Sequence, residues 1–334
     1  MHVRLRPLAL ALVAVLPLAA CGGDPSGGRT SAATAVPASS VSHAFGSTEL
    51  PDDPQRVVTW GWGSADAAIA LGVVPVAISA QAYGGDADGV LPWVRERLEA
   101  DGAAVPEVLP DTQEVPVEAI AAAQPDLILA PYSGITESEY EQLSRLAPTV
   151  AYPEQAWSTP WQDTIRIVGE ALGRTEQAEA LLDDIDATVA EQAEAHPEFE
   201  GTSIAMVAST PDAFYVYRPT DPRVQFALDL GFTSAESVES LASGDDTFFY
   251  TLSTERLAEL ESDVLVSFAA SPAEADAFLA SAPAKLLPQV ARGSVAPVVG
   301  TQLVASVSPP TALSLTWALE DYVAALATAA RAAG

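Results

Sequence analysis

Ser64 lies in the segment of this chain that comes nearest to a catalytic motif. The residues Gly61-Trp62-Gly63-Ser64-Ala65-Asp66 superficially match the strand-to-helix turn that presents the nucleophilic serine of many hydrolases. That turn requires glycine two residues before and two residues after the serine, and Trp62 and Asp66 occupy these positions. Only His196 follows as a general base. We therefore expect Ser64 to be a helix N-cap and the chain not to be an enzyme, with an extracellular esterase as the alternative.

Metal binding by histidine is a second chemistry that the residue types allow. The three histidines are His2 in a predicted leader, His43 in a predicted tether and His196 at the end of a predicted long helix. Side chains so placed cannot converge on one ion, so we expect no direct metal site of the kind that zinc or manganese carriers use. A site made only of carboxylates stays open, although most acidic residues should lie on solvated faces.

The composition indicates a folded, acidic protein of about two domains. Of the 334 residues 49% are hydrophobic and 18% are charged, which allows a sizeable core and excludes wholesale disorder. The 45 acidic and 15 basic residues give a formal charge of −30, which excludes nucleic-acid capture as the main activity. The single cysteine, Cys21, excludes an internal disulfide framework and a zinc–thiolate cluster.

The N-terminus has the pattern of a secretory leader. A basic start precedes 13 apolar residues, from Leu8 to Ala20, which is shorter than the roughly 20 residues of a membrane-spanning helix. The run ends in Leu18-Ala19-Ala20-Cys21, which is similar to the lipobox of bacterial lipoproteins. We therefore predict a signal peptide over 1–20 and lipidation of Cys21. An ordinary secretory signal with an incidental cysteine is the alternative.

The next segment, 21–44, is predicted to be a flexible lipidated tether. It consists mainly of Gly, Ser, Thr, Ala and Pro, which cannot bury enough surface to offset the entropy of ordering. The expected location of the protein is therefore extracytoplasmic, anchored by lipid to the outer face of the cell membrane.

Two similar halves follow, and each alternates short apolar strands with helices. This alternation is typical of a parallel sheet covered by helices on both faces. VEAIAAAQPDLILA from Val117 and TERLAELESDVLVSF from Thr254 share one order of helix and strand. We predict an α/β fold of two Rossmann-like lobes with mostly parallel sheets, over 45–160 and 200–334. Strands are expected at 56–60, 73–78, 126–130, 149–152, 203–208 and 263–268, and helices at 64–71, 117–123, 139–147, 224–230, 253–260 and 311–331.

A helical segment over 161–199 is predicted to join the lobes. Its pattern is broken only around Gly173-Arg174, and Thr175 is a good N-cap for the longer helix that follows. About 21 residues at ~1.5 Å each would span about 30 Å, the diameter of a small domain. One stiff helix allows less hinge movement between lobes than two or three crossing strands would.

These features together resemble a known family, the extracytoplasmic substrate-binding lipoproteins of ABC importers for ferric siderophores, whose relatives bind cobalamin or heme. The resemblance covers nearly the whole mature chain and rests on the order and spacing of several segments. It implies that a ferric siderophore binds between the lobes without a further cofactor. It also implies that the loaded protein, a monomer, docks on a permease driven by a cytoplasmic ATPase. The segments are the lipobox, RVVTWGWGSADAAIALGVVPVAI, VEAIAAAQPDLILA, AYPEQAWSTPW and YVYRPTDPR.

The resemblance also assigns ligand-binding residues to loops at the ends of the strands. Aromatic faces would cover the hydrocarbon of the chelate, and Arg would donate to the metal-bound oxygens. Each aromatic could instead pack in a core, as we expect for Trp60, and Arg218 could form a surface ion pair with Asp221. The implied ligand-binding residues are Trp62, Tyr83, Tyr132, Trp157, Tyr215, Tyr217, Arg218 and Arg223.

Glu118 and Glu255 resemble the pair of carboxylates, one per lobe, that family members present to arginines of the permease. Two separated acidic points would set the register and the association rate of docking. Each also lies near a predicted helix start, where the helix dipole favours negative charge, so a local role is the alternative.

The sequence constrains the identity of the ligand less. The strong negative charge favours neutral or cationic ferric hydroxamates over polyanionic ferric catecholates, although a local Arg can override a global field. Cobalamin and heme are alternatives, because aromatic faces would also accept flat macrocycles.

Overall fold

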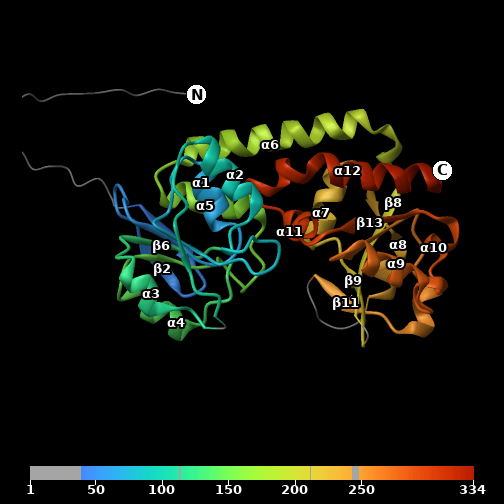
Figure 1. Ribbon diagram of the computed structural model, residues 1–334, viewed down its shortest axis with the longest axis horizontal. Coiled ribbons are helices and arrows are strands. Elements are labelled where there is room, and N and C mark those ends of the chain that lie inside the picture. The colour runs from blue at the N-terminus through green and yellow to red at the C-terminus, as the bar shows by residue number, and fades with distance from the viewer. Residues whose placement is uncertain (1–38, 113, 211, 243–247) are drawn as a thin grey trace, which may run out of the picture. The chain divides into compact units, whose positions relative to one another are not determined.

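A computed structural model describes residues 39–112, 114–210, 212–242 and 248–334 of the chain (Figure 1). The predicted signal peptide, Cys21 and most of the predicted tether lie outside these residues. None of the helices in the described segments is both long enough and apolar enough to cross a membrane. The described residues form two lobes, each with its own central sheet.

The first lobe is built on a sheet in which all neighbouring strands are parallel, in the order β5-β4-β3-β6-β7. Successive residues of its central strands are buried on opposite faces. Leu127 and Leu129 join the cluster that contains α5, whereas Ile128 packs with Ile120 and Leu143 from α3 and α4. Burial on both faces explains why these strands are continuous apolar runs. The strands are β3 (Val57–Thr59), β4 (Ala77–Ser79), β5 (Glu107–Leu109), β6 (Leu127–Leu129) and β7 (Thr149–Val150), and the helices are α1 (Ser64–Ala70), α2 (Pro92–Ala100), α3 (Val117–Ala122) and α4 (Glu137–Ser144).

A short hairpin precedes this lobe and corrects the predicted boundary at residue 45. Strands β1 (Ser40–His43) and β2 (Gly46–Glu49) pair antiparallel, and the amide of Ala44 donates to the carbonyl of Tyr152 at 2.9 Å. His43 is buried and its Nε2 lies 2.9 Å from the Thr48 hydroxyl, so it belongs to the folded lobe and not to a tether. Because small polar residues occupy alternate positions of β1, its composition resembles that of a flexible tether.

The second lobe has a mixed sheet in the order β11-β9-β8-β12-β13, with β10 beside β8. The pairs β8–β12, β12–β13 and β8–β10 are parallel, whereas β9 is antiparallel to both of its neighbours. The prediction of two α/β lobes with mostly parallel sheets is confirmed. The strands are β8 (Ser203–Ser209), β9 (Phe214–Tyr217), β10 (Thr233–Ser234), β11 (Phe249–Thr251), β12 (Val264–Ala269) and β13 (Val295–Val299), and the helices are η1 (Pro197–Phe199), α7 (Pro222–Asp229), α8 (Glu236–Leu241), η2 (Thr254–Glu259), α9 (Pro272–Ala280), η3 (Ala284–Leu286), α10 (Pro288–Arg292) and α11 (Thr301–Val307).

Several local predictions were wrong in detail. Ser64 and Thr175 are the first residues of their helices, and Gly63 and Arg174 occupy the N-cap positions without a side-chain cap. The segment predicted as a helix over 253–260 is the 3₁₀ helix η2. The final helix, α12, begins at Ser314 rather than at residue 311.

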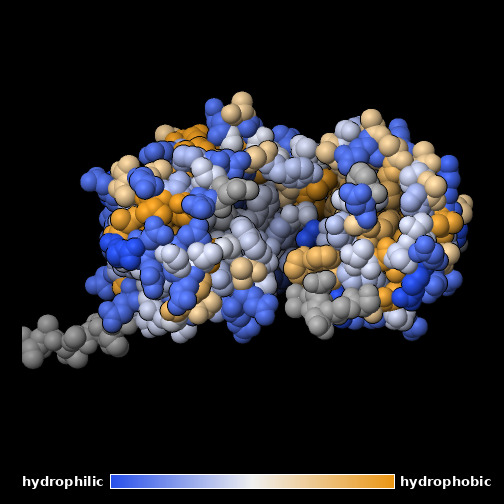
Figure 2. Space-filling view, turned by 90° about the horizontal axis from the view of Figure 1, so that it is seen from below, coloured by the Kyte–Doolittle hydropathy of each residue, from blue (hydrophilic) through white to orange (hydrophobic). Residues whose placement is uncertain are grey.

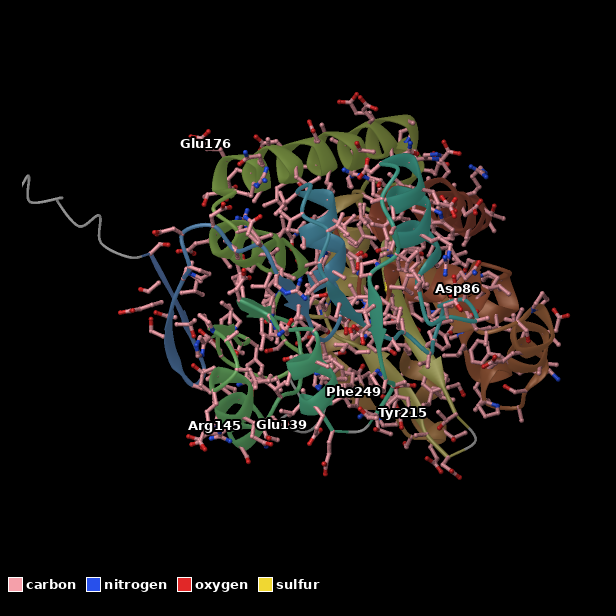
Figure 3. All side chains as sticks on the ribbon, turned by 60° about the vertical axis from the view of Figure 1, so that its left-hand side comes forward. Asp86, Glu139, Arg145, Glu176, Tyr215 and Phe249 are labelled. Carbon is pink, nitrogen blue, oxygen red and sulfur yellow. The ribbon has the colours of Figure 1, made fainter. Side chains whose placement is uncertain are left out.

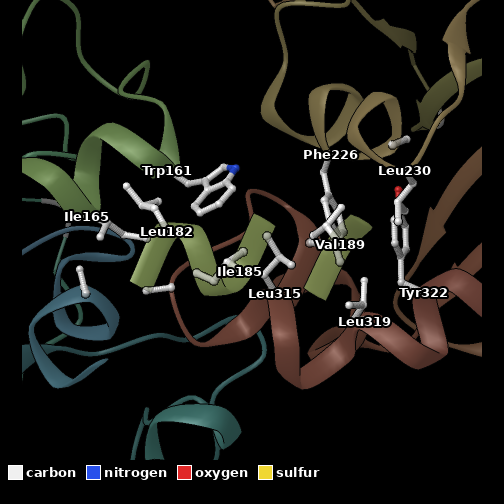
Figure 4. Close-up of a cluster of buried hydrophobic side chains, with 14 of the residues drawn as sticks. Trp161, Ile165, Leu182, Ile185, Val189, Phe226, Leu230, Leu315, Leu319 and Tyr322 are labelled. Carbon is white, nitrogen blue, oxygen red and sulfur yellow. The ribbon is translucent and has the colours of Figure 1, made fainter. Parts of the chain in front are cut away.

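Three helices contribute to one hydrophobic cluster that extends into both lobes: α5 (Trp161–Ala171), α6 (Thr175–Ala195) and α12 (Ser314–Ala333). In Figure 1, α6 runs along the top of the view above α12. Its buried residues Leu182, Ile185 and Val189 pack in one cluster with Trp161 of α5 and with residues of α7 and α12 (Figure 4). Each fully buried side chain of this kind contributes about 1.5–3 kcal/mol. The predicted bridging helix is therefore a shared core element as well as a connection.

Candidate functional site

A cavity of about 940 Å³ opens at the carboxyl ends of the first lobe's strands. Its wall includes Trp60 and Trp62 after β3, Gln81 and Tyr83 after β4, and residues 110–112, 114 and 115 after β5 together with the start of α3. Parallel strands place their carboxyl ends at one edge of a sheet, and the loops there converge on one space. Ala305 and Ser308, near the end of α11, complete the wall.

A second cavity, of about 720 Å³, has residues of both lobes in its wall. The first lobe contributes Trp62, Tyr132 and the segment from Glu154 to Gln162, and the second lobe contributes residues before and within α7 together with Phe248. Trp62, Trp157 and Ser308 line both cavities, so the two spaces adjoin. We call the two together the groove. Figure 2 shows the hollowed face of the molecule between the two bodies.

Trp62 is held at the junction of the two cavities by contacts to both lobes. Its indole N–H donates to the carbonyl of Pro309 at 3.0 Å, and its amide donates to the carbonyl of Tyr132, also at 3.0 Å. The preceding residue, Gly61, has φ +90°, and a Cβ there would lie 2.2 Å from the carbonyl oxygen of Tyr132. Only glycine therefore permits the loops after β3 and β6 to approach so closely.

Trp157 is the most exposed tryptophan of the groove, with 51% of its surface accessible. Its backbone has φ +60°, a conformation that a bulky residue rarely adopts and that tends to occur at functional sites. The ring meets Tyr132 edge to face with centroids 5.7 Å apart, and it covers Gly134, where a Cβ would lie 2.3 Å from Nε1. The positive φ of Trp157 and the absence of a side chain at Gly134 thus together place the indole in the groove.

Arg223 is the one basic residue that lines the groove within the described part of the chain. Its Nε donates to Oδ1 of Asp221 at 2.8 Å, and its amide donates to the same oxygen at 2.9 Å, so Asp221 is the N-cap of α7. The guanidinium carbon lies 4.1 Å from the centroid of the Tyr217 ring, a cation–π contact. Asp221 and Tyr217 together fix the position of this charge.

The tyrosines in the wall of the groove and directly behind it remain neutral hydrogen-bonding groups. Burial raises the pKa of Tyr132 to about 12 and raises the pKa of Tyr217. Burial, and then the carboxylate of Glu274 in α9, raise the pKa of Tyr83, which is 48% exposed at the edge of the first cavity. Each phenol therefore keeps its proton at neutral pH.

Three residues that the sequence places in the site line neither cavity. Tyr217 lies behind the wall, where its ring contacts the guanidinium of Arg223. Arg218 forms an ion pair with Glu239 of α8 at 2.9 Å, so the predicted alternative, an ion pair with Asp221, is wrong. Because β9 alternates sides, Arg218 projects to the face opposite Tyr217. Tyr215 meets Phe249 of β11 edge to face, with ring centroids 5.7 Å apart, and does not line either cavity. Both residues are labelled in Figure 3.

The structure also adds residues that the sequence did not single out. Phe248 and Ser308 line the groove, and Gln81 donates to the carbonyl of Gly61 at 3.2 Å. The aromatic run that begins at Phe248 was a readable signal, because it precedes a strand in the half that supplies Arg223. Ser308 gave none, since it reaches the groove only through the packing of α11.

The groove is acidic. The described residues of its wall include six carboxylates against the single guanidinium of Arg223. Within the same described residues, no group of three or more His, Cys, Asp and Glu side chains is arranged to hold a metal ion. Ser64 is fully buried and lies outside the wall of the groove, so it does not present a nucleophile there. The acidic residues of the wall are Asp111, Glu114, Glu118, Glu139, Glu154 and Asp221.

The two predicted docking carboxylates lie on different lobes. Glu118 is exposed in the first turn of α3 and contributes to the wall of the first cavity. Glu255 is exposed in the first turn of η2. Both carboxylates therefore lie where a helix dipole favours negative charge, as the alternative local role requires.

Two α/β lobes that share a long helix and enclose a groove define the class of a solute-binding protein. A family model described as periplasmic binding protein matches residues 57–296, and the chain belongs to this family. The resemblance drawn from the sequence is confirmed. A probable siderophore-binding lipoprotein of Bacillus subtilis, YfiY, is 30% identical over 261 residues, which cover 77% of this chain and 76% of YfiY.

Other relatives agree with this assignment. The Fe(3+) dicitrate-binding periplasmic protein FecB of Escherichia coli is 30% identical over 187 residues, covering 53% of this chain and 58% of FecB. The crystal structure of Streptococcus pneumoniae PiaA in complex with ferrichrome superposes with a TM-score of 0.80 at 33% identity. That match covers 88% of this chain and 99% of PiaA.

Proposed function

We propose that this protein captures a ferric siderophore of the hydroxamate type in the groove and delivers it to the permease of an ABC importer. The observation that carries the proposal is that two cavities adjoin at Trp62 and Trp157, with Arg223 on the wall that the second lobe supplies. Each cavity, of about 940 and 720 Å³, lies within the roughly 300–1,000 Å³ of common small-molecule sites, and together they leave room for a bulky chelate.

The side chains match the chemistry of such a chelate. Aromatic faces cover hydrocarbon, and Trp62, Trp157 and Tyr132 supply three of them. A guanidinium donates charge-assisted hydrogen bonds to oxygens bound to iron, and Arg223 is held in a position to do so. Relatives named for siderophore or ferric dicitrate binding, and PiaA with ferrichrome, support this ligand class.

The charge of the wall supports hydroxamate over catecholate or citrate ligands. Six carboxylates against one guanidinium repel a polyanionic chelate, whereas a neutral ferric hydroxamate meets no such repulsion. The preference comes from the groove itself, and the formal charge of −30 on the chain acts in the same direction.

The proposed setting is outside the cell. A lipid on Cys21 would hold the lobes near the membrane, and Glu118 and Glu255 would dock on arginines of a permease whose ATPase lies in the cytoplasm. The protein would act as a monomer with no cofactor of its own.

Titration of the purified protein with ferrichrome tests the function. We expect saturable quenching of tryptophan fluorescence and recovery of chemically unchanged chelate after release. Trp157→Ala should weaken binding about 10- to 100-fold, since it removes a central aromatic contact. Trp317→Ala is the control, because this partly exposed indole donates to Glu96 at 3.0 Å and does not line the groove. Absence of saturable quenching, or hydrolysis of the chelate, would contradict the proposal.

A further inference from the structure

Asp221 is buried, lines the second cavity and has one carboxylate oxygen that no described group satisfies. Oδ1 takes the amide and the Nε of Arg223, at 2.9 and 2.8 Å, while Oδ2 has no hydrogen-bond partner. Burying a carboxylate is costly even beside a guanidinium. A helix cap alone does not explain it, because Asn or Ser would cap α7 without the charge.

The surroundings of the pair contribute no other charge. Tyr132, Tyr217 and Tyr322 lie close enough to interact electrostatically with Asp221, and all three keep their protons at neutral pH. Glu154 lies on the exposed rim of the same cavity. Apart from the exposed Glu154, the charged groups among the described residues of this cavity's wall are therefore one carboxylate and one guanidinium in contact, which sum to zero.

We propose that Asp221 is a specificity-determining residue, which cancels the charge of Arg223 and so makes the groove select uncharged ferric chelates over anionic ones. This inference rests on the proposed function of the groove. Beyond the Nε that donates to Asp221, Arg223 keeps its terminal N–H donors for the oxygens around iron, but it offers no net attraction to a polyanion.

The decisive variant is Asp221→Asn, which retains the Oδ1 acceptor and the cap but loses the charge. We expect the affinity for a ferric tris-catecholate, relative to that for ferrichrome, to rise about tenfold at low salt. This gain should shrink at about 0.5 M salt, where charges are screened. If Asp221 had only a structural role, the variant would bind both ligands more weakly by the same factor, and the ratio of the two affinities would not change.

Asp101→Asn is the matched control. Asp101 accepts from the Nε of Arg97 at 2.8 Å, the same contact as in the Asp221–Arg223 pair, but neither residue lines the groove. This variant loses the same unit of charge from the protein and should leave the affinity ratio within about twofold. An equal rise in both variants would show a general charge effect and would overturn the proposal.

The unsubstituted protein gives a second measurement that does not depend on the folding of a variant. If Arg223 is neutralised, affinity for the anionic chelate should hold or rise as salt increases, because the salt screens repulsion by the acidic wall. A steep fall with salt would show an unmasked guanidinium and would overturn the inference. Failure of the unsubstituted protein to bind ferrichrome would instead reject the proposed function, so the two failures are distinguishable.

Discussion

The two walls of the groove are built by different means, although each lobe has a central sheet. The wall from the first lobe consists of loops that leave the carboxyl ends of parallel strands, and close backbone approaches fix its tryptophans. The wall from the second lobe depends on the turn between the antiparallel strand β9 and α7, where an ion pair fixes Arg223. The first wall supplies apolar faces and most carboxylates, and the second supplies the single guanidinium. In the proposed function, the first wall would cover the hydrocarbon of the ligand and the second would donate hydrogen bonds to its polar shell.

Gly61→Ala should break the first wall and gives the largest expected effect. An added Cβ would meet the carbonyl oxygen of Tyr132 at 2.2 Å, and φ +90° is strained for alanine. We expect a loss of roughly 3 kcal/mol in the free energy of unfolding, together with loss of ferrichrome binding. Chemical denaturation and ligand titration would measure the two.

Gly72→Ala separates crowding from backbone strain. Gly72 also has a positive φ of +79°, but its added Cβ would meet nothing within 4 Å. This control should lose only about 1–2 kcal/mol and should still bind ligand. Equal losses in the two variants would refute the claim that the close approach of two loops builds the first wall.

The pair Glu118→Ala and Glu255→Ala tests whether both lobes dock on one partner. The double variant should keep its affinity for ferrichrome and lose at least about tenfold in cellular iron uptake, since two charged contacts would be missing. Each single variant should lose less. Because Glu118 lines the first cavity, the affinity measurement decides the matter: reduced binding would assign Glu118 to the ligand site instead.

Substitution of Asp66, which joins residues of the two lobes, should give the smallest effect on stability. Its Oδ1 accepts from the indole N–H of Trp93 at 2.6 Å and from the hydroxyl of Thr311 at 2.5 Å. Burial raises the pKa of Asp66, so the folded protein holds this proton more tightly than the unfolded chain does. Stability from this group is therefore present below the unfolded pKa of about 3.9 and is lost as pH rises through the raised value, at no more than about 1.4 kcal/mol per pH unit.

Asp66→Asn retains the acceptor oxygen for both donors and removes the titration. Unfolding free energies measured against pH should show a flatter profile in this variant over that interval. Parallel profiles for the two proteins would contradict the assignment of a raised pKa to Asp66.

The sequence predicts the first wall better than the second, for a physical reason. In a parallel sheet all strands end at one edge, so aromatic residues just after the strands, such as Trp62 and Tyr132, must converge. Strand β9 runs antiparallel to both of its neighbours, so that rule does not place the residues at Tyr215–Arg223. Tyr217 and Arg223 meet, whereas Arg218 turns to Glu239 on the opposite face.

Other features could not be derived from the sequence. The hairpin at Ser40 has the composition of a tether, and Ser308 reaches the groove only through tertiary packing. The two N-cap predictions failed because a left-handed glycine and Arg174 occupy the caps, which shifts each helix start by one residue. The lobes, the bridging helix and the family, in contrast, depend on long apolar patterns that local details do not disturb.

A crystal structure of the protein grown with ferrichrome, with iron located by anomalous scattering, tests the central claim most directly. We predict one iron in the groove, with its ligand shell between the ring of Trp157 and the guanidinium of Arg223. Iron bound on any other surface, or saturating binding with the groove left empty, would contradict the account.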